Sequence, residues 1–135
     1  MTRGLTLARA AFSLVGVPFR LHGRDARTGV DCLGLVWLAM NRAGIHADAP
    51  VGYRLSNSCI DSWLPLARRA GWSETTGDIA VGDMLLMSLG PTRFHLLIAA
   101  EGGGVLHAHA GLRRVVHEPR TPDGLVLRHW RLDKE

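Results

Sequence analysis

Asp31-Cys32-Leu33-Gly34-Leu35-Val36 opens the stretch that decides how this chain folds, and an apolar run continues from Cys32 to Met40. The run is apolar nearly all the way round a helix, as expected for a helix that is buried on every side. The polar pair Asn41-Arg42 closes it, and Gly44 suits the left-handed position just past a helix end. We therefore predict a buried helix over residues 31–43 with Cys32 in its first turn.

Cys32 stands where a helix can change the chemistry of a thiol. Unpaired backbone N–H groups and the positive end of the helix dipole stabilise an anion in the first turn, so they favour the thiolate over the thiol. The same N–H groups can receive an oxyanion that forms on a substrate. These features make Cys32 a candidate nucleophile. The competing interpretation is a small buried hydrophobe without chemistry, which is the usual role of a cysteine outside a disulfide.

Three strand-like apolar runs follow, and two of them contain a histidine. His95 and His107 lie twelve residues apart, on either side of the turn sequence Glu101-Gly102-Gly103-Gly104. A nucleophilic cysteine needs a base to take its proton, and that base needs a polar partner to hold its ring. The two histidines can supply these two roles. Each one alone would more often be a surface or core imidazole without chemistry.

The glycine-rich turn predicts a β-hairpin that contains both histidines. Side chains on a strand alternate between the two faces of the sheet. If the hairpin pairs His95 directly with His107, the two side chains therefore lie opposite each other on the same face. That register needs a turn centred near Glu101, whereas the three glycines favour a turn one or two residues later. We therefore expect a bulge or a longer loop at this place.

In their order along the chain, these motifs resemble the NlpC-type papain-like cysteine peptidases, which cut peptidoglycan stem peptides. The resemblance covers residues 5–118 and implies that Cys32 is the nucleophile, His95 the general base and His107 the polar residue that orients the base. The matching elements are an N-terminal helix, Gly16-Val17-Pro18-Phe19, Asp31-Cys32-Leu33-Gly34-Leu35-Val36, Val81-Gly82-Asp83-Met84-Leu85-Leu86, His95 and Val105-Leu106-His107-Ala108.

Two positions depart from the family's usual pattern. The family usually has a tyrosine, with its hydroxyl near the active cysteine, where this chain has Phe19, and a serine where it has Leu33. Phe19 lacks the hydrogen-bonding hydroxyl of the tyrosine. The side chain of Leu33 should point into the core. We place four residues at the substrate-binding site: Phe19, Asp31, Arg24 and His109. The Asp-Cys-Leu-Gly-Leu-Val variant also looks like the peptidases encoded with phage tails and gene transfer agents.

The composition fits one compact enzyme domain over residues 1–135. A chain of 135 residues with 47% hydrophobic content has room for one core without disulfides. If Cys32 is catalytic, Cys59 has no partner, which suggests synthesis in a reducing compartment. Arg9 interrupts the N-terminal apolar stretch, and four of its apolar residues fall at helical spacing on one face: Leu7, Ala11, Leu14 and Val15. We therefore interpret that stretch as the first helix of the domain, not as a signal peptide. No segment approaches the roughly 20 apolar residues that span a membrane.

The formal net charge of +4 is moderate, and the arginines are spread along the chain. We expect no nucleic-acid partner, because aromatic interleaving and any recognisable nucleic-acid module are missing. A basic cleft would attract a carboxylate-rich stem peptide, but the preferred explanation of the charge is a solvated arginine-rich surface. His107 and His109 form an H-x-H pair, but no zinc-binding spacing accompanies it, so we predict neither a metal nor another cofactor.

The order of elements predicts an α+β domain with a papain-like fold, in which the helices pack on a small antiparallel sheet of about five strands. The end of the Cys32 helix should face His95 on that sheet. After a connection over residues 47–57 we expect an amphipathic helix over residues 58–70, kinked or broken at Pro65 and stopped by Gly71. Five runs from Met84 onward suit an antiparallel meander: Met84–Leu89, Phe94–Ala100, Val105–Ala110, Arg113–Glu118 and Leu125–Leu132.

The resulting functional hypothesis is a cell-wall hydrolase that cleaves an amide bond in a peptidoglycan stem peptide through a thioester. The resemblance implies the bond between γ-linked D-glutamate and the diamino acid. Without a signal peptide, the enzyme would reach the wall with phage-tail or secretion-machine proteins, or after lysis. Two alternatives stay open: an amidase or acyltransferase with the same Cys-His pair, and a non-catalytic phage-tail or wall-binding module.

Overall fold

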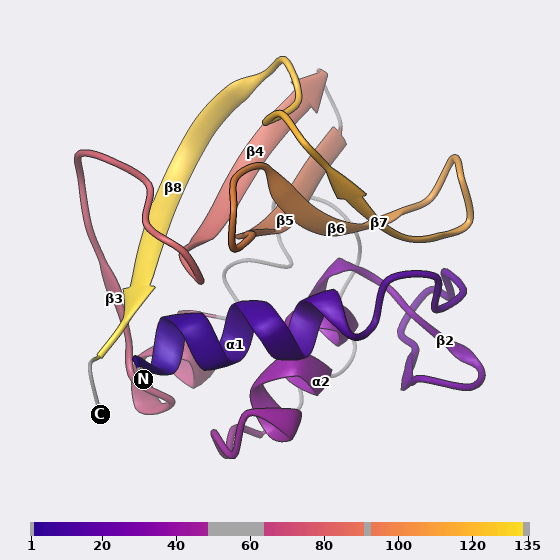
Figure 1. The fold of residues 1–135 in the computed structure, drawn as a ribbon, viewed down its shortest axis with the longest axis horizontal. Coiled ribbons are helices and arrows are strands. Elements are labelled where there is room, and N and C mark those ends of the chain that lie inside the picture. The colour runs from indigo at the N-terminus through magenta and orange to yellow at the C-terminus, as the bar shows by residue number, and fades with distance from the viewer. Residues whose placement is uncertain (1, 49–63, 91–92, 134–135) are drawn as a thin grey trace.

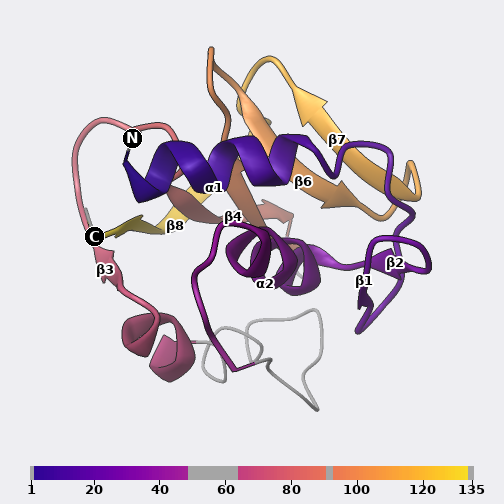
Figure 2. The same ribbon diagram turned by 60° about the horizontal axis from the view of Figure 1, so that its bottom comes forward.

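Six strands of this protein form one antiparallel sheet, and two helices lie against one side of it (Figures 1 and 2). The computed structural model describes residues 2–48, 64–90 and 93–133. Residues 64–69 are also helical. The other elements, in chain order, are α1 (Arg3–Phe12), β1 (Arg24–Asp25), β2 (Gly29–Val30), α2 (Cys32–Arg42), β3 (Trp72–Glu74), β4 (Met84–Gly90), β5 (Arg93–Ala99), β6 (Val105–His109), β7 (Arg114–Glu118) and β8 (Leu125–Leu132).

The α+β class and all five predicted strands are confirmed, but the main sheet has six strands instead of five. The additional strand is β3, which pairs with the end of β8. With only three residues, β3 is too short to produce the alternating pattern that identifies a strand in a sequence. The strands β1 and β2 are shorter still and form a separate two-stranded hairpin.

The expected meander is wrong for the last strand. The order in the sheet is β3-β8-β4-β5-β6-β7, so β8 returns to pair with β4 and not with β7. The outer edge of β7 is already occupied, because the backbone of Val115 exchanges hydrogen bonds with Gly16 and Val17, and Phe19 donates to the carbonyl of Arg113. The position beside β4 also buries the Trp130 side chain, which is 2% exposed. These two features explain the return.

Alternation along the central strands separates two apolar clusters. The even-numbered residues of β4, β5 and β6 join α1 and α2 in the main core, whereas four odd-numbered residues (Leu85, Met87, Leu97 and Val105) form a second, smaller cluster. Strand side chains point alternately to opposite faces, so the two clusters lie on opposite sides of the sheet. The whole Cys32 run except Trp37 and Leu38 is buried, as predicted for α2.

The first helix follows its predicted pattern until its last turn. Thr2 caps α1 by accepting a hydrogen bond from the backbone N–H of Leu5 at 3.1 Å. The predicted face is confirmed at Leu7, Ala11 and Leu14, which are all buried. Val15 is an exception, with 42% of its surface exposed. The helix ends at Phe12, so Val15 no longer follows helical spacing.

The second predicted helix region is only partly covered by the structure. Residues 64–69 are helical, and Gly71 follows them with φ +104°, as expected for a glycine that ends a helix. Pro65 lies within this helical segment. Residues 49–63, which include most of the predicted connection, the start of the helix and Cys59, lie outside the described residues. Gly44 has φ +79° and confirms the predicted end of α2.

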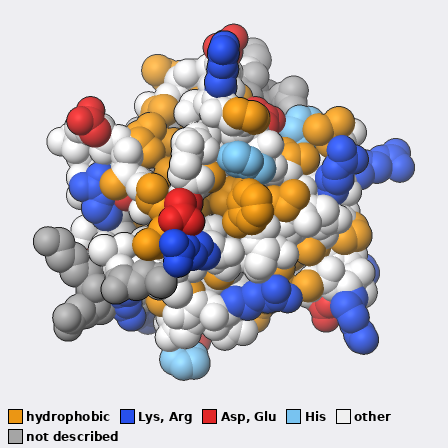
Figure 3. Space-filling view, viewed as in Figure 1, with side chains coloured by type: hydrophobic (Ala, Val, Ile, Leu, Met, Phe, Trp, Pro, Cys, Tyr) orange, Lys and Arg blue, Asp and Glu red, His pale blue; other side chains and the backbone are white. Residues whose placement is uncertain are grey.

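The face crossed by α1 has an apolar patch outside the core. Phe12 is 54% exposed, and its ring packs edge-on against that of His117 with centroids 5.7 Å apart. Figure 3 shows hydrophobic side chains gathered near the middle of this face with a histidine beside them, while lysine and arginine side chains are spread around them. Within the described ranges, no helix is long and apolar enough to cross a membrane.

Candidate active site

The side chain of Asp31 caps the N-terminus of α2 and binds the loop beside it through two hydrogen bonds. One carboxylate oxygen accepts from the backbone N–H of Gly34 at 2.8 Å, and the other accepts from that of His22, also at 2.8 Å. The first bond is a helix N-cap, which satisfies one of the unpaired N–H groups of the first turn. The second ties the loop before β1 to the same helix end. Asp31 is fully buried, so this predicted substrate-binding residue also has a structural role.

Cys32 is the first residue of α2, as predicted. Its side chain is a thiol outside any disulfide and is only 2% exposed. Gly34 is required two residues later, because a Cβ there would collide with the carbonyl oxygen of Gly23. The loop therefore crosses directly over the first turn of α2. The glycine of the Asp-Cys-Leu-Gly motif thus permits this close approach.

Phe19 and Arg24 flank this helix end from the segment before it. Phe19 forms an isolated parallel bridge with Val30, the residue directly before Asp31, and packs against the main core. Arg24 pairs with Val30 from the other side, in the β1–β2 hairpin. The Nε atom of Arg24 is buried and has no hydrogen-bond partner among the described residues. Both predicted substrate-binding residues thus lie close in the fold to the start of α2.

His95 and His107 lie together, although not in the predicted register. The pairs Ile98–Leu106 and Ala99–Val105 centre the hairpin on Gly102, one residue later than direct pairing of the histidines requires. Extended along the strands, this register sets Leu97 opposite His107, so the two histidines are diagonal neighbours. Diagonal side chains on one face remain within reach of each other. The ring centroids are 6.1 Å apart, with the ring planes at 87°.

His107 is held from the opposite direction by Glu118, a residue that the sequence did not single out. The Nε2 atom of His107 lies 2.9 Å from Oε1 of Glu118, and the His107 side chain is 3% exposed. Burial lowers the pKa of His107, and the hydrogen bond and charge of Glu118 only partly oppose this. His107 is therefore predominantly neutral at pH 7.

His109 has a local role at the β6–β7 turn. Its Nδ1 atom accepts a hydrogen bond from the backbone N–H of Leu112 at 3.0 Å, and its ring lies 5.5 Å from that of His107. Because Nδ1 accepts, a neutral His109 has its proton on Nε2. The predicted substrate-binding role of His109 stays a prediction. Among residues 2–48, 64–90 and 93–133, no group of three or more His, Cys, Asp or Glu side chains could hold a metal ion.

A second polar cluster lies at the start of β4 and was not predicted. Asp83 is 1% exposed and accepts hydrogen bonds from Arg131 at 2.9 Å and from the backbone of Ala80 at 2.8 Å, while His129 Nε2 lies 2.6 Å away. Burial alone would raise the pKa of Asp83, but these hydrogen bonds and the Arg131 charge together hold it below its usual value. Asp83 belongs to the Gly82-Asp83 motif, and its contacts show that the motif fastens β8 to β4.

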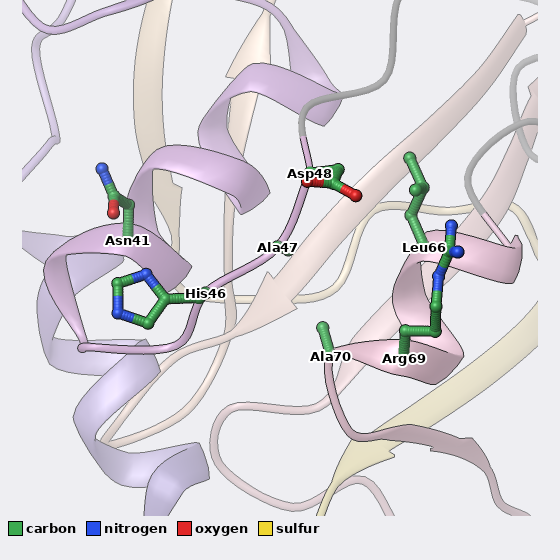
Figure 4. A pocket seen from close by; sticks show the side chains of 7 residues that line it. All are labelled: Asn41, His46, Ala47, Asp48, Leu66, Arg69 and Ala70. Carbon is green, nitrogen blue, oxygen red and sulfur yellow. The ribbon is translucent and has the colours of Figure 1, made fainter.

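A pocket of about 340 Å³ opens between the end of α2 and the helical segment 64–69 (Figure 4). None of the seven residues that line it is a predicted site residue. They are Asn41, His46, Ala47, Asp48, Leu66, Arg69 and Ala70. The candidate site therefore consists of the capped start of α2 and the histidines of the sheet. α2 packs against β5 and β6, the strands that carry His95 and His107. That the start of α2 faces His95 stays a prediction.

Solved structures with the same fold include NlpC2 from Trichomonas vaginalis, with 16% identity and a TM-score of 0.70 over 96% of this chain and 48% of that chain. The peptidoglycan hydrolase RipB from Mycobacterium tuberculosis has 22% identity and a TM-score of 0.63 over 97% of this chain and 65% of that one. The P60 domain of an M. avium subspecies paratuberculosis antigen has 21% identity and a TM-score of 0.62, and the match covers 96% and 93% of the two chains.

This chain thus spans about half the length of the Trichomonas protein, but nearly all of the isolated P60 domain. No curated protein sequence matches it. A model of the NlpC/P60 family matches residues 16–124, which include the start of α2 and all three histidines of the candidate site. The match covers most of the chain and agrees with the fold, so the chain belongs to the NlpC/P60 family.

Proposed function

We propose that this chain is a cell-wall hydrolase that cleaves an amide bond in peptidoglycan stem peptides, with Cys32 as the nucleophile and His95 as the general base. The observation that carries the proposal is the placement of Cys32 as the first residue of α2, on a helix capped by Asp31 and packed against the two histidine-bearing strands. The family match and the likeness to RipB, a peptidoglycan hydrolase, support the choice of substrate.

The proposed reaction has two halves. The Cys32 thiolate attacks the amide carbonyl carbon while its former proton resides on His95, and backbone N–H groups at the start of α2 receive the oxyanion. His95 then gives the proton to the leaving amine, and the C–N bond breaks to leave a thioester. In the second half, His95 takes a proton from water, the hydroxide attacks the thioester, and the proton returns to the Cys32 sulfur. His107 orients His95 throughout.

Arg24 and Phe19 are the residues we assign to substrate placement. The buried Nε of Arg24 has no hydrogen-bond partner among the described residues, so a substrate carboxylate would satisfy it. Stem peptides are rich in carboxylates. We further propose the bond between γ-linked D-glutamate and the diamino acid as the target. The route to the wall with phage-tail or secretion-machine proteins stays a prediction.

Digestion of purified peptidoglycan, with new termini identified by mass spectrometry, tests the proposal. The wild type should release a free amine on the diamino acid, and Cys32→Ala should release none. Cys59→Ala is the control, because it removes the other thiol and should keep full activity. His95→Ala should abolish turnover because it removes the proton shuttle, whereas His107→Asn should leave a measurable fraction.

The same experiment separates the alternatives. Cleavage between the glycan and the peptide would identify an amidase, and a product that carries an added amine would identify an acyltransferase. A wild type that sediments with intact peptidoglycan but releases no product would identify a wall-binding module. Near wild-type turnover by His95→Ala would show that another residue is the base.

A further inference from the structure

We propose that Glu118 is a positioning residue of this active site, which holds His107 in the tautomer whose Nδ1 atom can accept a hydrogen bond from His95. The inference rests on the proposed function, in which His95 is the general base and His107 orients it. It adds a third member to the polar chain behind the cysteine, which we call the diagonal row: His95, His107 and Glu118.

The register of three neighbouring strands builds the diagonal row. In the β6–β7 pairing, His107 is level with Val116 and Glu118 is level with Val105, so Glu118 is diagonal to His107 on the same face. His95 is diagonal to His107 from β5, in the opposite direction along the strands. The row therefore crosses β5, β6 and β7 in one line, and these strands lie side by side in Figure 1.

The contact with Glu118 determines which nitrogen of His107 bears the proton. A carboxylate is only an acceptor, and it lies 2.9 Å from Nε2, so Nε2 donates. In a neutral ring, Nδ1 is then a lone-pair acceptor. This Nδ1 atom is buried and has no hydrogen-bond partner among the described residues. The His95 ring, 6.1 Å away between centroids, is the donor that we assign to it.

The charge of Glu118 matters at one step of the reaction. When His95 takes the thiol proton it becomes a cation, and its N–H then donates to Nδ1 of His107. His107 stays neutral because burial lowers its pKa, so it transmits the effect of the carboxylate without taking the proton itself. Among the described residues, the titratable side chains in contact with His107 are His95 on β5, His109 on β6 and Glu118 on β7. The helix α2, which begins at Cys32, also packs against β6.

Alternatively, Glu118 could serve only to hold β7 against β6. That role needs the hydrogen bond to His107 but not the negative charge of Glu118. Glu118→Gln separates the two roles, because its amide oxygen can still accept from Nε2 while the charge is lost. Glu118→Ala removes both. Glu101→Gln is the matched control, since Glu101 is a surface glutamate in the turn between β5 and β6 and its carboxylate pairs with Arg9 of α1.

The first test is peptidoglycan cleavage across pH with these three variants of the full chain. We expect Glu118→Gln to lower kcat by about tenfold and Glu118→Ala by about a hundredfold, part of the roughly 10²–10⁴ that a positioned acid–base group contributes. KM should stay unchanged. The apparent pKa of the histidine limb of the kcat/KM profile should fall in both, because the imidazolium loses a stabilising charge. Glu101→Gln should match the wild type.

The second test does not require activity. Nitrogen-15 NMR of the histidine rings of the wild type at pH 8 should show His107 with its proton on Nε2. Glu118→Ala should shift part of the population to the Nδ1–H form. A wild type with the proton on Nδ1 overturns the proposal, even if the Glu118 variants fail to fold.

The outcomes also separate this inference from the proposed function. If Cys32→Ala matches the wild type on peptidoglycan, the proposed function fails, whatever the NMR spectra show. If Cys32→Ala is inactive but folded Glu118→Ala keeps the wild-type kcat and pH profile, the role of Glu118 is overturned and the proposed function stands. If Glu118→Ala loses kcat but Glu118→Gln does not, Glu118 only holds β7 against β6, and its proposed positioning role is also overturned.

Discussion

The carboxylate of Asp31 joins the backbone N–H of Gly34, inside α2, to that of His22, in the loop that crosses the helix end. One buried side chain thus both begins the helix and fixes the segment above it. Cys32 lies between the two bonded groups in the sequence. The position of the candidate nucleophile therefore depends on its immediate neighbour.

Asp31→Ala should destabilise the protein by about 2 kcal/mol, the upper end of the range for an N-cap residue, because the carboxylate is buried and both of its bonds are lost. Urea denaturation measures the change. Thr2→Ala is the matched control, since Thr2 caps α1 at an exposed site and its loss should cost less than about 1 kcal/mol. Equal losses would contradict the role given to burial.

The Cys32 thiol should react with iodoacetamide faster than that of Cys59 at pH 6. The first turn of α2 stabilises the thiolate, which is the reactive form. Mass spectrometry of the two peptides after timed alkylation gives both rates. In urea the helix is lost, and the two rates should become similar. Equal rates in the folded protein would argue against a nucleophilic Cys32.

Asp83→Ala should destabilise the protein by about 3 kcal/mol, because it removes a buried carboxylate from His129 and Arg131. The folded-state pKa of Asp83 is lowered, so its contribution is present above the unfolded value of 3.8 and is lost as pH falls through the folded value. The difference in unfolding free energy between wild type and variant should therefore be constant from pH 5 to 7 and shrink below about pH 4.

Arg131→Ala is the control for this cluster. The Arg131 side chain is 45% exposed, so its loss should cost less, about 1 kcal/mol. A larger loss in Arg131→Ala than in Asp83→Ala would show that the carboxylate is not the centre of the cluster.

His107→Asn should flatten the pH dependence of stability near neutrality. Burial lowers the pKa of His107 below the ordinary 6.5, so below pH 6.5 the unfolded chain binds a proton that the folded protein does not. The wild type should lose up to about 1.4 kcal/mol per pH unit from this group as pH falls from 6.5 towards the folded value. Chemical denaturation at pH 5, 6 and 7 tests this. An unchanged slope in His107→Asn would contradict this effect of burial.

Phe19→Tyr should raise kcat/KM on a stem-peptide substrate several-fold. The added hydroxyl restores the group that the family usually has, and one hydrogen bond contributes about 0.5–1.5 kcal/mol, where about 1.4 kcal/mol is tenfold. Phe19 is only partly buried, so the thermal melt should hardly change. Phe12→Tyr, on the exposed face of α1, is the control and should not alter activity. A clear loss in folded Phe19→Tyr would mean that the pocket is built differently.

The fold was predictable wherever one local signal was sufficient. The apolar run from Cys32 and the glycine after it placed α2 to within a residue, and short apolar runs bounded by turn residues placed the five longer strands. The β3 strand escaped prediction because three residues carry no periodicity. The β8 strand was assigned to the wrong neighbour because occupation of the β7 edge by residues 16–19 is a contact between segments far apart in the sequence.

Some residues of the candidate site could be identified from the sequence, and others could not. Cys32, His95 and His107 stood out because their residue types and order are unusual. Glu118 and the cluster around Asp83 did not, because an acidic residue near a strand end has no pattern of its own. Glu118 becomes notable only when the β6–β7 register brings it to 2.9 Å from His107.

By itself, the sequence determined α2, the five longer strands and the candidate catalytic residues that they carry, since apolar runs and turn preferences act over a few neighbouring residues. Only the tertiary structure decided the register of β5 against β6, the place of β8 beside β4 and the partner of His107. Strand pairing is a choice among nearly equivalent backbone hydrogen bonds, and the burial of distant side chains makes that choice. A shift of one residue in the turn moved His107 from directly opposite His95 to a diagonal position, which still leaves the two rings in contact.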